Sequence, residues 1–396
     1  MINQSFTIRN HTFDNRVVFQ PMEGCDCLPD GTPSDYTIRK YMRFASGGSG
    51  LIWFEANAVC PEGKANPRQL MLTKDNLDSF KKLVDDVREK ALKDTGFVPQ
   101  MILQLTHSGR QSVTPLTMYK NEVYEATGKT GPIATDDYLD RLPEFYTIST
   151  RLAEEAGFDG IDIKACHGYL LMEAMSAFER EGKYGGSFEN RTRLYRNCFN
   201  AAKEAKKADT LLTARLGLCD MVAKPNGFGT DENNNPELSE PIALVGMLKE
   251  EGLDLLNITI GNPYYNPHVN RPFKVGAYTP PESAEVGLER FKYVTGTIKN
   301  AHKDLPIVAS GLSYYRENMI DQGSEMIESG ICDFAGFGRI ILAYPEFYRD
   351  YKNGGIQKKK LCALCSKCTE LMRGKCVSGC ALHDEVYREI YRGMKK

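Results

Sequence analysis

The stretch that decides the fold is residues 157–171, GFDGIDIKACHGYLL. Its apolar run after two glycines predicts a short, largely buried strand. Lys164, His167 and Tyr169 follow closely, and they supply two cationic or hydrogen-bonding groups and a phenol that is protonated at neutral pH. Residues just past the C-terminal ends of parallel barrel strands face the substrate, so the stretch predicts a barrel strand that runs into an active site. Standing alone, the same residues would also fit satisfied polar groups in a core.

The rest of the chain alternates apolar runs with longer amphipathic ones. Strands are expected at residues 17–20, 51–54, 101–105, 160–163, 212–216, 253–258, 307–309 and 334–337. Helices are expected at 35–45, 75–93, 149–156, 190–207, 241–251, 284–301, 316–329 and 345–352. This alternation requires crossovers and a parallel sheet. Eight units favour an α/β fold of the TIM (β/α)8 barrel type over a doubly wound open sheet.

Long polar segments follow four of the predicted strands. They cover residues 106–137, 164–188, 219–238 and 259–281. Connections of this length are usually functional loops or lids. In a barrel, all four would open on one face.

Length and composition allow either one large domain with a small appendage or two domains. The expected division is a barrel at 1–355 and a cysteine-rich extension at 356–396. The charge balance, 50 Lys+Arg against 52 Asp+Glu, gives no reason to expect nucleic acid or an anionic membrane as a partner. The N-terminal residues lack the apolar core of a signal peptide, and no apolar run could span a bilayer, so a cytoplasmic protein is expected.

Twelve cysteines are unusual for such a chain, and five of them crowd into residues 362–380. In a reducing compartment a dense cluster is more typical of metal binding or redox activity than of disulfides. The spacing is Cys362-x2-Cys365-x2-Cys368-x7-Cys376-x3-Cys380. Four thiolates so close together fit either a cubane iron–sulfur cluster or a tetrahedral zinc site. The spacing alone does not decide between the two.

Further polar groups follow other strands. Gln104 offers both a donor and an acceptor suited to the edge of an amide-like heterocycle, and Arg215 provides a fixed cation. Glycines after the last two predicted strands, in SG at 310–311 and GFGR at 336–339, let backbone N–H groups approach a phosphate. Each signal is weak by itself, but their order along the chain is consistent with one ligand across the barrel mouth.

At this point the chain resembles the Old Yellow Enzyme family of flavin-dependent ene-reductases, over roughly residues 5–350. The likeness rests on NRVVFQPM at 15–22, GLIWFEANAV at 50–59, QLTHSGR at 104–110, GFDGIDIKACHGYL at 157–170, KYGGSFENRTRL at 183–194 and GFGR at 336–339. The resemblance implies FMN over the C-terminal barrel mouth. Its isoalloxazine would be lined by Pro21, Met22, Glu23 and Ala56, its pyrimidine side held by Gln104 and Arg215, and its phosphate held by Ser310, Gly311, Gly338 and Arg339.

The resemblance also implies a reaction, hydride transfer from reduced FMN to an activated C=C bond of a small unsaturated carbonyl or carboxylate compound. Lys164 and His167 match the pair that polarises the substrate, and Tyr169 matches the proton donor. Histidine is common in the family at the first of these positions. The lysine predicts an anionic substrate, unless it pairs with a nearby carboxylate instead.

Other residues are expected to reach the substrate. Tyr264, Tyr265 and His268, in a loop after the sixth predicted strand, would contact it from above, unless that loop is only structural. Cys25 either points into the pocket or simply packs.

The C-terminal cysteines resemble the iron–sulfur branch of the same family, which includes 2,4-dienoyl-CoA reductase and trimethylamine dehydrogenase. The matching ligands of a [4Fe–4S] cluster are Cys362, Cys365, Cys368 and Cys380, with Cys376 as an extra and zinc as the alternative metal. No GxGxxG follows a strand. Electrons are therefore expected either from NAD(P)H in the same pocket or from a separate electron-donor protein through the cluster.

Other readings stay open from sequence. One is an amine dehydrogenase or demethylating oxidoreductase that passes electrons out through the cluster. Another is a non-catalytic electron carrier or zinc-bound structural subunit, and a third is an aldolase or isomerase with Lys164 as a Schiff base. The substrate, the physiological reductant and the oligomeric state, including a homo-oligomer, are left open.

Overall fold

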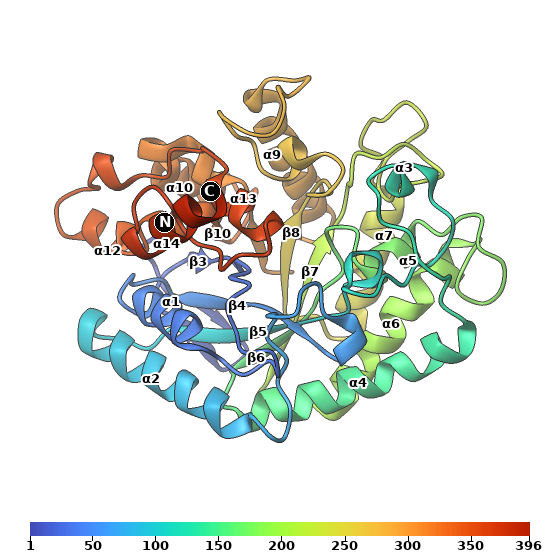
Figure 1. Ribbon diagram of the computed structural model, residues 1–396, viewed down its shortest axis with the longest axis horizontal. Helices are drawn as coiled ribbons and strands as arrows, with labels where there is room; N and C mark the ends of the chain where they lie inside the picture. Colours follow the sequence, from blue (N-terminus) through green and yellow to red (C-terminus); the bar gives the residue numbers. More distant parts are fainter.

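The computed structural model describes residues 1–396 and contains a closed barrel of eight parallel strands, in the order β10-β3-β4-β5-β6-β7-β8-β9 (Figure 1). The strands are β3 (Val17–Phe19), β4 (Leu51–Ala58), β5 (Gln100–Thr106), β6 (Gly160–Ile163), β7 (Leu211–Gly217), β8 (Leu255–Thr259), β9 (Ile307–Ala309) and β10 (Phe334–Phe337). The predicted TIM barrel is confirmed. Each apolar run proposed as a strand forms one, because each is buried on both of its faces.

Helices surround the barrel in the expected alternation. They are α1 (Asp35–Ala45), α2 (Leu77–Thr95), α4 (Asp136–Glu155), α6 (Phe188–Ala205), α7 (Ser239–Glu250), α9 (Ala284–Ala301), α10 (Met319–Glu328) and α12 (Phe347–Lys352). The helix expected at 149–156 is only the end of α4, which begins at a Thr135 cap and contains Pro143. A proline within a helical pattern usually indicates a helix boundary, which is why the earlier part of α4 is not evident from sequence.

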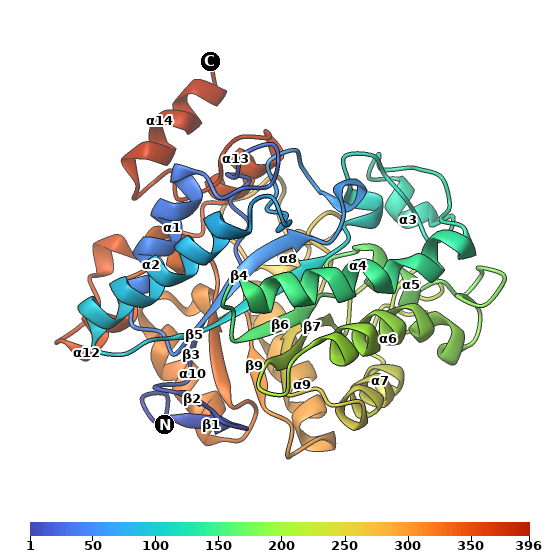
Figure 2. The ribbon, with the colours of Figure 1, turned by 90° about the horizontal axis from the view of Figure 1, so that it is seen from below.

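The end of the barrel opposite the active site is closed by an N-terminal hairpin of β1 (Phe6–Ile8) and β2 (His11–Phe13) (Figure 2). Ile8 and Phe13 pack against Trp53, Phe334 and the other inward-facing side chains of the lower barrel layer. Because this end is filled, ligands reach the barrel interior from the C-terminal ends of the strands.

Short elements gather at that open end, which we call the mouth. They are η1 (Pro61–Gly63), η2 (Gly109–Gln111), α3 (Glu122–Glu125), α5 (Leu170–Met175), α8 (Pro267–Asn270), η3 (Leu312–Asn318) and α11 (Arg339–Ala343). In Figure 2, α3 lies at the side of the molecule away from β1 and β2. The long segments predicted to open on one face therefore do so.

Residues 356–396 form an extension that packs on the mouth, with η4 (Lys358–Lys360), α13 (Lys367–Arg373) and α14 (Glu385–Met394). Asp384 accepts hydrogen bonds from Arg39 and Arg43 of α1. The backbone N–H of Ser378 donates to the carbonyl of Gly24, with N···O 2.6 Å. The extension thus contacts both a helix and a loop beside the barrel. No helix in the structure has the length and apolar character needed to cross a membrane.

Candidate active site

Tyr169 lies at the centre of a polar cluster on the mouth. It is the residue that precedes α5, and its hydroxyl donates to Glu23 Oε1 at 3.2 Å. The Tyr264 hydroxyl is 3.3 Å from the Tyr169 hydroxyl, and the Lys164 Nζ is 3.5 Å from Glu23 Oε1. Lys164 Nζ also lies 4.0 Å from the centroid of the Tyr169 ring. Loops after β3, β6 and β8 therefore bring together residues that are far apart in the sequence.

The pairing of Lys164 with Glu23 bears on the expected preference for an anionic substrate. Lys164 is 2% exposed on its side chain and Glu23 17% exposed. A buried cation beside a carboxylate has much of its field compensated. The structure therefore has the alternative arrangement, in which Lys164 pairs with a carboxylate. The lysine also lies beside the ring of Tyr169.

Burial sets the protonation of Tyr169. Its pKa is raised well above the usual value by burial, by the Glu23 carboxylate and by Tyr264. The phenol is therefore protonated at neutral pH and able to give a proton.

His167 has an unusual backbone conformation and a buried ring nitrogen that a ligand could contact. Its backbone has φ 66°, in the left-handed region that non-glycine residues rarely adopt. Its Nε2 is buried and has no hydrogen-bond partner in the protein. Burial, together with the positive charges of Arg215 and Lys164, lowers its pKa well below the usual value, so the imidazole is neutral. A buried polar nitrogen without a partner is costly, and a bound ligand would supply one.

Asp162 organises the floor of the site and is not evident as a functional residue from sequence. Its Oδ2 accepts hydrogen bonds from Trp53 Nε1 at 2.9 Å and Gln104 Nε2 at 2.6 Å, and its Oδ1 accepts from the backbone of Arg215 at 2.6 Å. Burial raises the pKa of Asp162 to about 6. Gln104 donates to Asp162 through its side-chain nitrogen, so the side-chain carbonyl oxygen of Gln104 remains free to accept a hydrogen bond. An acidic residue inside an apolar strand run is the signal that could have revealed this role.

The residues predicted to hold the FMN phosphate also lie near one another. Gln20 Nε2 is 3.2 Å from Ser310 Oγ, and a Cβ at Gly336 would lie 2.0 Å from the same Gln20 nitrogen. Gly311 has φ 87°. Arg339 donates from Nη2 to a backbone carbonyl, while its buried Nη1 has no partner. A cation with an unused donor beside a glycine-lined turn has the chemistry that an anionic group requires.

The loop that carries Glu23 is supported from below by buried charges that sequence inspection does not single out. Lys40 Nζ donates to Asp26 Oδ2 at 2.7 Å and to the Glu55 carboxylate. The other oxygen of Glu55 accepts from the Gly24 N–H at 2.6 Å. The presence of an acidic residue, Glu55, inside the apolar sequence of β4 (Leu51–Ala58) is the signal that could have revealed this network. This network fixes the backbone next to Glu23.

Cys25, in the same loop, is 5% exposed and has φ 47°. Burial, followed by the Glu23 and Glu55 carboxylates, raises the pKa of its thiol well above the usual value. A neutral thiol is a poor nucleophile, so the site offers no activated cysteine here.

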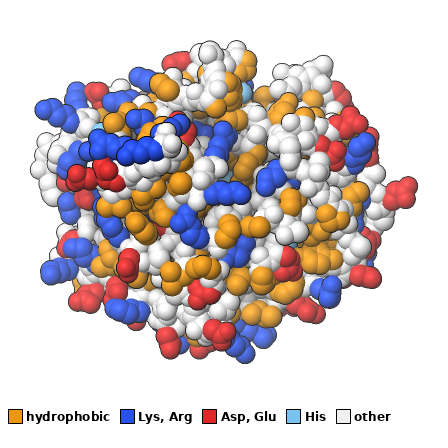
Figure 3. Space-filling model, viewed as in Figure 1, with side chains coloured by type: hydrophobic (Ala, Val, Ile, Leu, Met, Phe, Trp, Pro, Cys, Tyr) orange, Lys and Arg blue, Asp and Glu red, His pale blue; other side chains and the backbone are white.

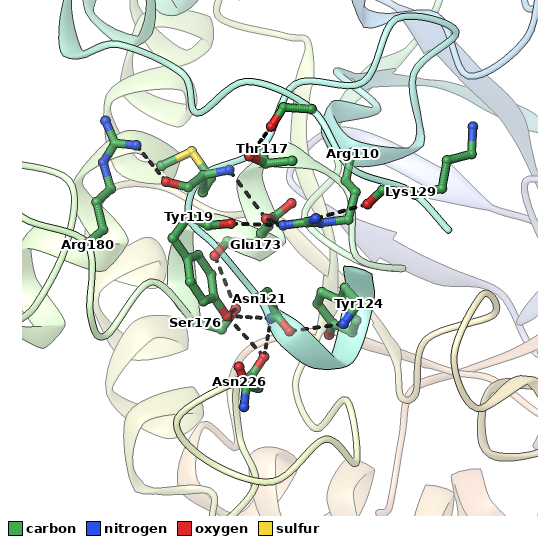
Figure 4. Close-up of polar contacts among 12 residues, drawn as sticks. Arg110, Thr117, Tyr119, Asn121, Tyr124, Lys129, Glu173, Ser176, Arg180 and Asn226 are labelled. Atoms are coloured by element: carbon green, nitrogen blue, oxygen red, sulfur yellow. Dashed lines mark hydrogen bonds and ion pairs between the residues drawn. The ribbon is translucent and has the colours of Figure 1, made fainter. Parts of the chain in front are cut away.

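A second buried network, shown in Figure 4, joins Glu173 of α5 to Arg110. Arg110 and Glu173 form an ion pair with neither side chain exposed, and Arg110 also donates to the carbonyls of Tyr119 and Lys129 at 2.9 and 3.0 Å. The Glu173 N–H donates to the Tyr169 carbonyl at 2.8 Å, one helical turn away. The pair therefore ties the loop after β5 to the helix that Tyr169 begins.

Only some of the residues predicted to contact substrate join the cluster. Tyr264 does, as described. Tyr265 is 46% exposed and lies edge-on to Tyr124, and His268 bonds to Tyr278, with 2.6 Å between Nδ1 and the hydroxyl. The contacts of these two residues are therefore with side chains outside the Tyr169 cluster.

The remaining predicted cofactor residues lie along the same mouth. Pro21 and Ala56 are buried, and a Cβ built on Gly338 would lie 3.2 Å from the Met22 sulfur. The residues expected beside the ring and those expected beside the phosphate are therefore contiguous. The donors and acceptors present fit FMN.

The five C-terminal cysteines are partly buried in the extension. Cys362 is close enough to Cys365 and Cys368 for their charges to add to the burial that raises its pKa. Burial raises the pKa of Cys380 to about 11. No three His, Cys, Asp or Glu side chains converge in a geometry that would hold a single metal ion.

Comparison with known proteins identifies the family. Residues 2–357 match the model of the NADH:flavin oxidoreductase / NADH oxidase family. The chain belongs to this family. It is 30% identical over 267 residues to the NADPH dehydrogenase of Bacillus velezensis, which covers 65% of this chain and 72% of that protein. It is 28% identical over 357 residues to the NADPH dehydrogenase of Bacillus subtilis, with coverage of 87% and 91%.

Longer relatives match nearly the whole chain, including the extension. The NADH oxidase of Thermoanaerobacter brockii is 27% identical over 97% of this chain and 56% of its own length. Among solved structures, a 2-naphthoyl-CoA reductase matches with a TM-score of 0.79, 19% identity and coverage of 98% of this chain and 57% of that one. An Old Yellow Enzyme homologue from Zymomonas mobilis matches with a TM-score of 0.68, 20% identity and coverage of 90% and 94%. The chain spans just over half of the two longer relatives.

Family membership confirms the predicted resemblance to the Old Yellow Enzymes. The protein is an FMN-dependent oxidoreductase of the ene-reductase type, and the family uses a nicotinamide nucleotide as reductant.

Proposed function

We propose that this protein reduces the activated C=C bond of a small unsaturated carbonyl or carboxylate compound. One observation carries the proposal: the buried, unpartnered Nε2 of His167 lies in the same six-residue segment as the buried Tyr169 phenol. The first group suits a carbonyl oxygen and the second a carbon that must receive a proton.

The proposed FMN site uses the residues expected from the family. Gln104 and Arg215 would hold the pyrimidine side, Pro21, Met22, Glu23 and Ala56 would line the ring, and Ser310, Gly311, Gly338 and Arg339 would hold the phosphate. The free carbonyl of Gln104 and the unpartnered Arg339 Nη1 support this assignment. When bound and reduced, FMN supplies the hydride that one alkene carbon receives.

The chain's own residues would then polarise the substrate and deliver the proton. His167 donates a hydrogen bond to the activating carbonyl oxygen, where negative charge develops, and Lys164 adds a positive charge nearby. Tyr169 gives its proton to the carbon next to the carbonyl group. Because Glu23 balances part of the Lys164 charge, neutral enones and unsaturated acids are both within the proposed range.

In Figure 3, Lys and Arg side chains gather over the central part of the face seen in Figure 1. Arg271 donates to Ser366 Oγ at 3.4 Å and Arg373 donates to the carbonyl of Pro263 at 3.1 Å, and neither of these acceptors carries a charge. Such a surface suits the phosphates of NAD(P)H, or an acidic electron-donor protein, as the electron source.

We also propose a [4Fe–4S] cluster on Cys362, Cys365, Cys368 and Cys380. Zinc needs four ligands around one ion at about 2.3 Å, whereas the iron and sulfide atoms of a cluster hold the thiolates farther apart. Cys365 and Cys368 contribute to the raised pKa of Cys362, and Cys362 and Cys368 contribute to that of Cys380, so the four thiols lie near one another, as either centre requires. The likeness of the cysteine spacing to the iron–sulfur branch of the family favours the cluster over zinc.

Elemental analysis tests the cluster. Protein purified without oxygen is expected to contain iron and acid-labile sulfide in equal amounts and little zinc. Cys368→Ser should lose most of the iron, whereas Cys376→Ser, the matched control, should keep it. Stoichiometric zinc without sulfide would contradict the proposal.

The proposed reaction is tested with Tyr169→Phe and 2-cyclohexen-1-one as the probe. The flavin of the variant should be reduced at the normal rate, but its reoxidation by the enone should slow about 100-fold or more, because the proton donor is missing. Tyr265→Phe is the control and should behave like the parent, because Tyr265 lies in the same loop as Tyr264 but is 46% exposed and packs against Tyr124. A colourless protein that takes up no FMN would contradict the whole assignment.

A further inference from the structure

We propose that Arg271 and Arg316 are counter-charges of the C-terminal cysteine centre, where they raise its reduction potential and strengthen its hold on metal. The inference rests on the proposed function, in which four cysteines of the extension carry a [4Fe–4S] cluster. A centre on four thiolates carries a net negative charge, because the thiolates outweigh a doubly positive core. An anion of this kind at a partly buried position needs positive charge close by.

The backbone of the cysteine segment, residues 362–368, is bent and held in place. Leu364 has φ 57° and Ser366 has φ 58°, both in the left-handed region that non-glycine residues rarely adopt. The Leu364 carbonyl accepts from the backbone N–H of Lys274 at 3.2 Å. The segment is therefore fixed against the connection after β8, which also carries Arg271.

Two arginines donate to this cysteine segment. Arg271 Nη1 donates to Ser366 Oγ at 3.4 Å, and Arg316 Nη1 donates to the Cys362 carbonyl at 2.9 Å. Neither acceptor carries a charge, and neither arginine has a carboxylate within ion-pair distance. Glu317, next to Arg316, pairs with Lys358 at 2.8 Å. Both arginines are half-buried, so water and salt screen their charges less than those of exposed side chains.

Arg271 lies among cations rather than beside an anion. Burial and the charge of Arg339 lower the pKa of Arg271 to about 10, whereas a thiolate at Cys368 acts in the opposite direction. Arg339 is bonded to the same connection, because its Nη2 donates to the Pro272 carbonyl at 2.6 Å. Like charges gathered at partly buried positions are costly unless an anion joins them. The proposed FMN phosphate is the anion for Arg339, and the cysteine centre is the anion for Arg271 and Arg316.

Arg316 has a strained backbone. Its φ of 51° and ψ of −109° interrupt η3. Such conformations persist only where the surrounding structure fixes them, and they are concentrated at functional sites. The hydrogen bond to the Cys362 carbonyl is a contact that this conformation allows.

The experiment measures the reduction potential of the cluster in the FMN-loaded enzyme, purified without oxygen and titrated with dithionite. The EPR signal of the reduced cluster is recorded, since it differs from that of a flavin radical. Arg271→Gln and Arg316→Gln should each lower the equilibrium constant for one-electron reduction about tenfold, a shift of about 59 mV to lower potential. The reason is that each variant loses a positive charge that favours the added electron. Both variants should also release iron to a chelator faster than the parent.

Charge and structure are separated by conservative variants and by a matched control. Arg271→Lys and Arg316→Lys keep the positive charge and should keep most of the parental potential. Arg68 also donates to a carbonyl of the extension, that of the exposed Lys375, at 2.7 Å. Arg68→Gln should leave the potential unchanged. An equal shift in Arg68→Gln would assign the effect to a loosened extension and overturn the inference.

The remaining outcomes distinguish the inference from the proposed cluster. If the protein contains iron and sulfide but both glutamine variants keep the parental potential, the inference is wrong and the cluster stands. If Arg271→Gln weakens FMN retention and leaves the potential unchanged, Arg271 belongs to the phosphate site instead.

Two further outcomes have a defined meaning. Should a glutamine variant not assemble the cluster, assembly in the matching lysine variant would support a need for charge, and failure of both would overturn the inference. If zinc takes the place of iron, the proposed cluster fails. Faster zinc release from the glutamine variants than from the lysine variants would then support the counter-charge role, and equal release would exclude it.

Discussion

At the scale of single residues, this protein positions its reactive groups with buried charges. Tyr169 is held on α5 by Glu173, and Glu173 is neutralised by Arg110. Neither side chain of the pair has any exposed surface. A buried ion pair contributes little net stability relative to an apolar replacement, but removing one partner leaves a charge that water cannot reach.

Breaking this pair should be strongly destabilising. Arg110→Met and Glu173→Gln are each expected to lower the free energy of unfolding by about 3–5 kcal/mol, and the double variant by less than the sum. Urea unfolding at neutral pH, with the slope compared among variants, measures this.

The control is the exposed pair of Lys82 and Asp86 on α2, joined at 2.9 Å. Lys82→Met should change stability by less than about 0.5 kcal/mol. Equal effects at the two pairs would show that burial of Arg110 and Glu173 does not determine the cost.

At the scale of elements, the mouth loops are joined to one another by Asp220, which follows β7. Its carboxylate accepts from the Phe228 N–H at 3.1 Å and from the Tyr124 hydroxyl of α3 at 3.2 Å. Its carbonyl accepts from Asn266, in the loop after β8, at 2.9 Å. Three connections of the barrel are thus held by one residue.

The ionisation of Asp220 should make stability depend on pH. Burial raises its pKa to about 7, above the value in the unfolded chain, so the folded state binds the proton more tightly. Its contribution to stability is present below about pH 4 and is lost as pH rises through 7. Asp220→Asn should therefore show a smaller fall in melting temperature between pH 5 and pH 8 than the parent. A fall as large as that of the parent would assign the pH dependence to other groups.

At the scale of the whole molecule, the C-terminal extension connects the barrel rim to the site. Asp384 caps α14 and receives Arg39 and Arg43 from α1, while Ser378 bonds to Gly24 next to Glu23. α1 also carries Lys40, the centre of the charge network below that loop. The extension therefore contacts one side of the loop that carries Glu23, and the barrel supports the other side of that loop.

Loosening the extension should weaken cofactor binding. Asp384→Ala removes a helix cap and two ion pairs, and we expect a loss of about 1–2 kcal/mol, faster proteolysis between residues 356 and 396, and weaker FMN retention on dialysis. Arg392→Ala, on the exposed side of α14, is the control and should be neutral. Normal FMN retention in Asp384→Ala would show that the extension does not stabilise the flavin loop.

Much of the candidate site is foreseeable from sequence, for a reason that lies in barrel geometry. Lys164, His167 and Tyr169 follow a strand directly, and strand ends in a closed barrel meet at one mouth. Tyr265 and His268 lie several residues beyond their strand, where the path of the loop sets the direction of each side chain. The sequence pattern has no information about that path, and in the structure these two residues contact Tyr124 and Tyr278.

The amino-acid sequence by itself determined the barrel, because the hydrophobic pattern and the burial of each strand are local properties of that segment. It also determined which residues stand at strand ends, and through its motifs the family. Only the tertiary structure decided that Glu23 meets Lys164 and Tyr169, that Lys40 meets Glu55, and that Ser378 meets Gly24. These contacts join residues far apart in the chain, and the closure of the barrel and its loops, rather than any repeating pattern, sets their distances.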